Sequence, residues 1–135
     1  MTSAELRYLI AADELYDGRN GVKLTEIAEE RGVSKVSVYR AAERLEKNGY
    51  IRRDEKNKVV LTEYGSFKLK EYRQIVSFVS EHLSMQCDIP YEEAYEDALG
   101  VACAFGDRSR EAIAKLLRGP LPECNYKKTE AKEND

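Results

Sequence analysis

The sequence contains few of the residue types from which metal centres, catalytic sites and disulfide frameworks are built. Its 135 residues include one histidine, three cysteines, three prolines and no tryptophan. The cysteines, Cys87, Cys103 and Cys124, lie far apart and none belongs to a C-x-x-C pair. Neither a disulfide framework nor a self-contained zinc module is therefore predicted, and we expect reduced thiols in or near the core.

Sequence patterns of membrane proteins, secreted proteins and common enzymes are also absent. No apolar run approaches the length that spans a bilayer. The first residues, MTSAELRYL, lack the basic-then-apolar order of a signal peptide. The sequence has no H-E-x-x-H, no G-x-S-x-G and no glycine-rich phosphate loop. We therefore expect a cytoplasmic protein that makes no membrane contact and is not an enzyme.

Charges of opposite sign are concentrated in different parts of the chain. The formal net charge is only −3, which by itself does not suggest a nucleic-acid partner. Between Lys35 and Lys58, however, basic residues outnumber acidic ones, whereas the stretch from Asp88 to Asp107 contains acidic residues and no basic residue. This segregation predicts two surfaces with different partners, the basic one suited to nucleic acid.

The first half of the sequence has the element order of a winged helix-turn-helix. A helix is predicted over residues 3–16, followed by a short helix capped by Thr25 and broken at Gly32. Ser34 caps the next helix, and Gly49 follows its end. Residues 50–53 and 58–61 then read as two short strands joined by a turn, D-E-K-N.

The second half is predicted to be entirely helical. After Thr62 a long helix follows, then one that begins near Pro90, then one whose inner face holds Ala112, Ile113, Leu116 and Leu117. The predicted fold class is therefore mainly α, with a winged helix-turn-helix DNA-binding domain at 1–64 and an all-helical dimerisation and effector domain at 65–118. The polar tail, 119–135, is predicted to be disordered.

The helix that begins after Ser34 has the pattern of a recognition helix. With Val38, Ala42 and Leu45 facing the core, helical geometry turns the basic and polar residues near its start outward. An arginine can donate two hydrogen bonds to guanine, and a valine can contact a thymine methyl group. Lys35 and Arg44 suit phosphates, and the wing adds further positive charge. The predicted contacts to double-stranded DNA are Ser34, Lys35, Val36, Ser37, Tyr39, Arg40, Arg44, Arg52, Arg53, Lys56 and Lys58.

Nearly the whole chain up to Leu117 resembles one family of regulators. The segments that carry the resemblance are LTEIAEERGVSKVSVYRAAERLEKNGYI with VVLTEYG, and IPYEEAYEDALGVACAFGDRSREAIAKLL. They resemble the metal-dependent transcriptional repressors typified by the diphtheria toxin repressor and the manganese transport regulator. The resemblance implies a homodimer that binds a pseudo-palindromic operator and represses transcription when loaded with iron or manganese.

The ligand positions that the resemblance implies hold unsuitable residues. These positions correspond to Gln74 on the long helix, to Leu99, Ala102 and Cys103 on the next helix, and to Arg7 and Ile10 on the first. Leucine, alanine and isoleucine have no donor atoms, and arginine keeps its proton. Of the set, only Cys103 is a good ligand. The resemblance therefore implies a degenerate metal site, and no cofactor is certain.

Two alternatives stay open at this point. A rebuilt site that uses Cys103, His82 and Cys87 could bind iron, manganese or zinc, or could act as a thiol switch. Some winged helices bind proteins instead of DNA, so the fold could also serve as a protein-interaction module.

Overall fold

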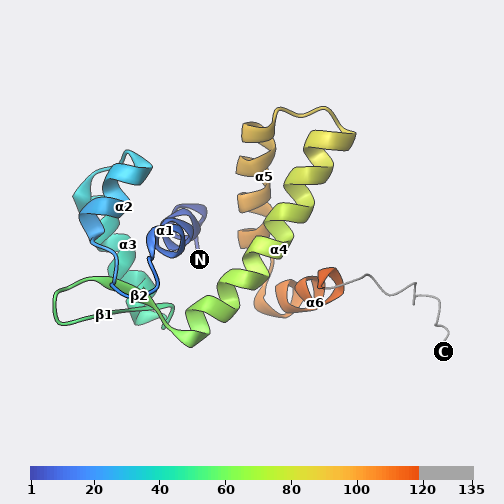
Figure 1. Ribbon diagram of the computed structural model, residues 1–135. Helices are drawn as coiled ribbons and strands as arrows, with labels where there is room; N and C mark the ends of the chain where they lie inside the picture. The colour runs from blue at the N-terminus through green and yellow to red at the C-terminus, as the bar shows by residue number, and fades with distance from the viewer. Residues whose placement is uncertain (119–135) are drawn as a thin grey trace. The chain divides into compact units, whose positions relative to one another are not determined.

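The computed structural model describes residues 1–118, and the predicted disordered tail at 119–135 lies outside them (Figure 1). The described chain is mainly helical with one two-stranded sheet, as predicted. It forms two compact units, Met1–Lys70 and a second that begins at Glu71, so the division falls inside α4. The elements are α1 (Ser3–Leu15), α2 (Leu24–Arg31), α3 (Lys35–Lys47), β1 (Ile51–Arg53), β2 (Val59–Leu61), α4 (Glu63–Gln86), α5 (Tyr91–Ala104) and α6 (Asp107–Leu117).

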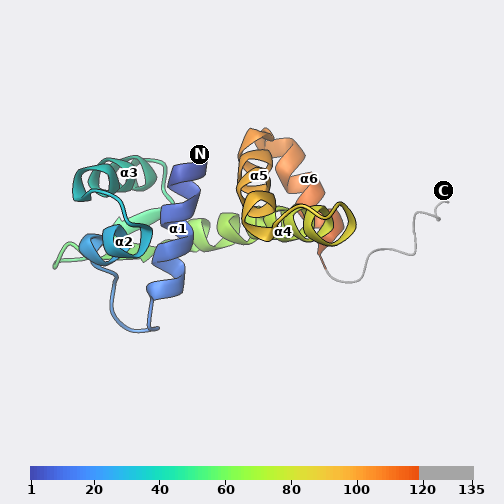
Figure 2. The same cartoon turned by 90° about the horizontal axis from the view of Figure 1, so that it is seen from above.

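In the first unit, three helices and a hairpin enclose one apolar core. Leu6 and Leu9 of α1, Ile27 of α2 and Val38 of α3 are almost completely buried. Gly32 ends α2 in the left-handed conformation, with φ of 65°, which lets the chain turn sharply into α3. Figure 2 shows α1, α2 and α3, the helices that contribute these side chains.

The start of α2 differs from the prediction. Thr25 does not cap the helix but lies half-buried within its first turn, and the N-cap residue is Lys23. The backbone N–H of Lys23 donates to the Glu26 carboxylate at 3.0 Å. Burial of Leu24 draws it into the first turn, so the helix begins before the threonine.

A bridge between two distant segments fixes the hairpin on the first unit. β1 and β2 pair antiparallel with Arg52 opposite Val60. Val22, in the loop after α1, forms two backbone hydrogen bonds with Val59 of β2, each 2.8 Å long. The hairpin is therefore joined to the α1–α2 loop as well as to the helices.

The second unit packs α5 and α6 against the later part of α4. Its core includes Tyr72 and Ile75 of α4 and Ala98 and Leu99 of α5, all at most 1% exposed. No helix of residues 1–118 combines the length and the apolar character that crossing a bilayer would require.

A buried arginine joins the three helices of the second unit. Arg110 of α6 is 3% exposed and donates to the carbonyl oxygens of Ala102 and Phe105, at 3.2 and 2.6 Å. It also donates to Asp107 at 2.8 Å, and its guanidinium lies 4.2 Å from the centre of the Tyr72 ring. Such a cation is stabilised by helix-end carbonyls and by the ring face.

This arginine changes the predicted inner face of α6. The structure buries Arg110 and Ala114, whereas Ala112 and Leu116 are exposed and Ile113 and Leu117 are only partly buried. An arginine is seldom buried without partners, and here the carbonyl groups at the end of α5 supply them. The apolar side chains of α6 are correspondingly left at the surface.

Candidate nucleic-acid interface

The predicted recognition helix is oriented as expected. Four residues of α3 face the core: Val38, Ala41, Ala42 and Leu45, each at most 4% exposed. The opposite side begins with Lys35, Val36, Ser37, Tyr39 and Arg40, all exposed. Val36 is 59% exposed, although it is apolar. The first two turns of α3 therefore offer charged, hydroxyl and methyl groups together, which are the groups that base edges and phosphates accept.

The start of α3 is held by the predicted cap. The Ser37 backbone N–H donates to Ser34 Oγ at 3.2 Å, and the two hydroxyl oxygens lie 3.0 Å apart. The predicted cap is confirmed, and it fixes the helix end that carries Lys35 and Arg40.

Arg44 lies on α3 but is engaged within the protein. Its Nε donates to Oε2 of Glu5 on α1, and the pair joins the two helices. The Glu5 side chain is 7% exposed and that of Arg44 is 54% exposed. Arg44 therefore helps to hold α3 in place, and the phosphate contact predicted for it stays a prediction.

Burial raises the pKa of Glu5, but hydrogen bonds and charge outweigh that effect. The side-chain bond from Arg44, the backbone N–H of Thr2 and the charge of Arg44 leave this pKa below its ordinary value of 4.5. The carboxylate is thus ionised in the folded protein, and its favourable contribution is present above pH 4.5. That contribution is lost as the pH falls through the folded-state pKa.

The two arginines of β1 point to opposite sides of the hairpin. Arg53 faces α3: its Nε lies 3.2 Å from Oε1 of Glu46, and its guanidinium lies 6.0 Å from the Tyr39 ring centre. The Arg53 side chain is 17% exposed, and its Nη1 donates to Asn57 Oδ1 at 3.3 Å. Arg53 therefore ties the wing to α3, whereas Arg52 is exposed on the other side.

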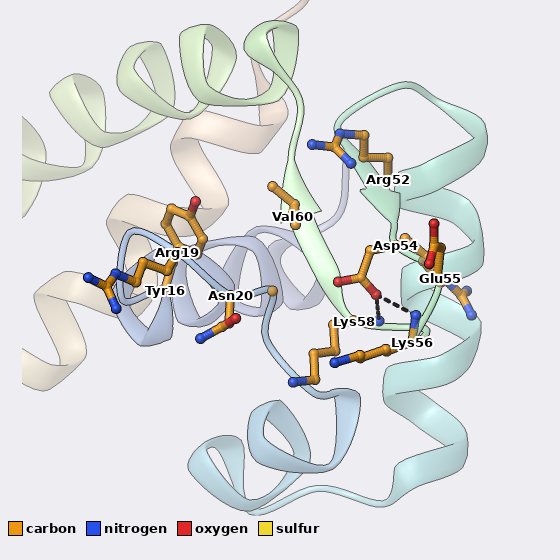
Figure 3. Close-up of a pocket in the computed structure, with 11 residues that line it drawn as sticks. Tyr16, Arg19, Asn20, Arg52, Asp54, Glu55, Lys56, Lys58 and Val60 are labelled. Atoms are coloured by element: carbon orange, nitrogen blue, oxygen red, sulfur yellow. Dashed lines mark hydrogen bonds between the residues drawn. The ribbon is translucent and has the colours of Figure 1, made fainter.

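The turn of the wing is shaped by one carboxylate. Asp54 Oδ1 accepts the backbone N–H groups of Lys56 and Lys58, each at 2.9 Å (Figure 3). The N–H of Lys58 is the main cause that lowers the pKa of Asp54 below its ordinary value, and the N–H of Lys56 adds to it. This turn places Lys56 and Lys58 at the rim of the hairpin.

The structure adds residues that the sequence did not single out. A cleft of about 560 Å³ lies between the wing and the α1–α2 loop, and Figure 3 shows side chains that line it from both walls. The loop contributes Tyr16, Arg19 and Asn20, and the wing contributes Arg52, Lys56 and Lys58 among others. Arg19 stands in the turn DGRNG, and no local pattern links that turn to a wing nearly forty residues later.

The candidate metal ligands are not brought together. His82 and Cys87 are exposed, Cys103 is partly buried, and His82 Nδ1 lies 2.8 Å from the Phe78 carbonyl oxygen. Among residues 1–118, no group of three or more His, Cys, Asp or Glu side chains could hold a metal ion. Leu99 and Ala102, two of the positions that the resemblance implies as ligands, are completely buried. Cys124 lies outside the described residues.

Comparison with known proteins supports the fold. Residues 15–55 match the IclR helix-turn-helix domain, and no curated protein matches the sequence significantly. The structure of a hypothetical protein from Sulfolobus solfataricus is 18% identical, with a TM-score of 0.66, and the match covers 89% of this chain and 92% of that one. The manganese regulator SloR (22% identity, TM-score 0.69) and ScaR with bound zinc (24%, 0.62) are also similar.

This chain has the fold of metal-dependent repressors. The match covers 89% of this chain for SloR and 86% for ScaR, but only 56% and 54% of those longer proteins. The chain thus spans about half the length of these two regulators. The predicted resemblance and the predicted winged helix-turn-helix are confirmed at the level of the fold.

Arg44→Ala should lower the free energy of unfolding by about 1–2 kcal/mol, because it leaves the buried Glu5 carboxylate without its partner in a half-exposed ion pair. Urea titration measures this loss. The loss should shrink as the pH falls from 4.5 through the lowered pKa of Glu5, because a protonated Glu5 no longer forms the ion pair with Arg44.

Arg40→Ala is the matched control, since Arg40 is an exposed arginine on the same helix. It should change the unfolding free energy by less than about 0.5 kcal/mol. Equal losses for the two variants, or a loss that does not depend on pH, would contradict the structural role of Arg44.

Proposed function

We propose that this protein is a sequence-specific DNA-binding transcriptional regulator, and a repressor, that inserts α3 into the major groove. The observation that carries the proposal is the sidedness of α3: Val38, Ala41 and Leu45 are buried, while Lys35 and Arg40 face solvent at the helix start. A recognition helix needs this division, because one side must hold it to the domain while the other meets base edges.

Each exposed residue near the start of α3 has a role in this proposal. Arg40 donates two N–H groups to the O6 and N7 atoms of a guanine, and Val36 contacts a thymine methyl group. Ser37 bonds a base or a phosphate, and Lys35 neutralises a phosphate without reading sequence. Tyr39 lies beside Arg53 of the wing, so the wing and the helix approach the duplex as one body.

Arg40→Ala should weaken binding to a selected operator by about 1–3 kcal/mol and relax the preference at one base position. The operator is first selected from random duplexes with the wild-type protein, and affinities are then measured by mobility shift. Binding to random duplexes should change much less, because phosphate contacts dominate there.

The control is Arg108→Ala, an exposed arginine of the second unit, which should leave the base preference unchanged. An equal loss on operator and random duplex would rule out base reading by Arg40. A wild-type protein with no salt-sensitive affinity for any duplex would favour a protein-interaction module.

We further propose that the protein acts as a homodimer on a pseudo-palindromic operator. Several large apolar side chains of the second unit are exposed in a single chain: Phe78, Met85, Tyr91, Val101 and Leu116. Pairing of two chains would cover apolar surface of this kind. Two recognition helices would then reach successive major grooves, roughly 34 Å apart.

Sedimentation equilibrium should give the mass of two chains at DNA-binding concentrations. Leu116→Asp should shift the equilibrium toward single chains, because it places charge on the covered surface. Val36→Asp is a matched control, since Val36 and Leu116 are 59% and 58% exposed, and it should leave the mass unchanged. A wild-type protein that sediments as one chain would refute the homodimer.

We propose that metal ions do not control DNA binding through the positions that the family uses. The buried, apolar Leu99 and Ala102 support this proposal, since neither residue can bind a cation. Gln74 offers only an amide, and the charged Arg7 repels a cation. Cys103 is the one good ligand among these positions, and together their residues do not fit a divalent metal.

Manganese or ferrous iron, compared with a chelator, should therefore change the Kd for the selected operator by less than about twofold, which corresponds to about 0.4 kcal/mol. A tightening of tenfold or more would overturn the proposal. Repeating the titration with Cys103→Ser would then show whether a rebuilt site at Cys103 causes the tightening.

A further inference from the structure

We propose that the cleft between the wing and the α1–α2 loop is a second phosphate-binding site. In this site Arg19 and Arg52 hold the DNA strand that lies across the minor groove from α3. The proposal rests on the function proposed above and extends it, because it assigns DNA contacts to the side of the wing that faces away from the recognition helix.

The two walls of the cleft are fastened to each other. The Val22–Val59 hydrogen bonds join the loop to β2 at the base of the cleft. Next to them, a Cβ atom on Gly21 would lie 2.7 Å from Lys58 Cβ, which is closer than side-chain packing allows. Only a glycine permits this approach, so the separation of the walls is set by the backbone.

An aspartate shapes the turn in each wall of the cleft. Asp17 Oδ1 accepts the N–H groups of Arg19 and Asn20, each at 2.8 Å, just as Asp54 accepts those of Lys56 and Lys58 in the wing. One oxygen of each aspartate is therefore engaged by the backbone of its own turn.

Two arginines of the cleft carry positive charge that no carboxylate among the described residues neutralises. Within residues 1–118, neither Arg19 nor Arg52 has a hydrogen bond or ion pair through its side chain. Asp54 and Glu55 also line the cleft but are outnumbered by basic residues that are not paired with Glu46, which are Arg19, Arg52, Lys56 and Lys58. An anion is therefore the ligand that these walls attract.

The position of the cleft favours a DNA strand over a small anion. Arg52 and Val60 are cross-strand partners that line the cleft, whereas Arg53 of the neighbouring pair faces α3. A wing that enters the minor groove has a phosphate strand on each side, because that groove is only about 6 Å wide. The α3 side of the wing would meet one strand, and the cleft would meet the other.

The test is Arg19→Gln in the full chain, measured as the salt dependence of binding to the selected operator. The slope of log Kobs against log salt should fall in magnitude by about 0.9, the value for one lost phosphate contact to B-DNA. Arg52→Gln should give a similar fall, and the double variant about twice as much. Base preference should not change, because phosphate contacts carry no sequence information.

Arg108→Gln is the matched control and should leave the slope unchanged. Ethylation of phosphates should interfere with wild-type binding at positions across the minor groove from the α3 contacts, and this interference should disappear in Arg19→Gln. An unchanged slope, or no interference at these phosphates, would overturn the proposal, as would binding of inorganic phosphate that depends on Arg19 without any effect on DNA affinity. In each of these outcomes the wild-type protein still binds the operator. If the proposed function itself is wrong, the wild-type protein binds no operator at all.

Discussion

The orientation of α3 about its own axis is the constraint on which the candidate interface depends. Val38, Ala41 and Leu45 are at most 3% exposed, so any rotation of the helix would bring apolar surface into water. Because successive residues of a helix point in fixed relative directions, burial of this stripe also determines where Arg40 points. The Glu5–Arg44 pair adds a polar tie between α3 and α1. The surface proposed to read DNA is thus a consequence of the core beneath it.

The second unit depends on a cation of its own. Arg110 donates hydrogen bonds to carbonyl groups near the end of α5, and its guanidinium lies over the ring of Tyr72. The exposed apolar side chains on α4 and α6 leave this unit with surface that a second chain could cover.

Features set by neighbouring residues could be predicted from the sequence. The Ser34 cap, the buried stripe of α3 and the hairpin follow from side-chain chemistry within a few residues, and the structure has all three. Thr25 was misassigned because the burial of Leu24, which depends on the tertiary core, decides where α2 begins. Burial of Arg110 could not be foreseen either, since its carbonyl partners belong to the preceding helix and turn.

The candidate site could be predicted only in part, because some of its features depend on neighbouring residues and others on contacts between distant segments. The exposed face of α3 follows from its buried apolar residues. The different contacts of Arg52 and Arg53, however, depend on which side of the hairpin faces α3. The position of Arg19 beside the wing depends on the Val22–Val59 bridge, which joins residues 37 positions apart. No local sequence pattern around either valine indicates this bridge. Long-range pairing of this kind is decided by the whole fold.

The same bridge has a consequence for how the protein behaves at high concentration. At Val59, β2 is paired on both sides, with Arg53 of β1 and with Val22 of the loop. A strand from another molecule could extend the sheet there only along the outer edge of β1, and that strand carries two adjacent arginines. Charged side chains at a sheet edge oppose edge-to-edge association. Arg52 and Arg53, which are proposed to act in DNA binding, thereby also oppose the pairing of hairpins from different molecules into a larger sheet.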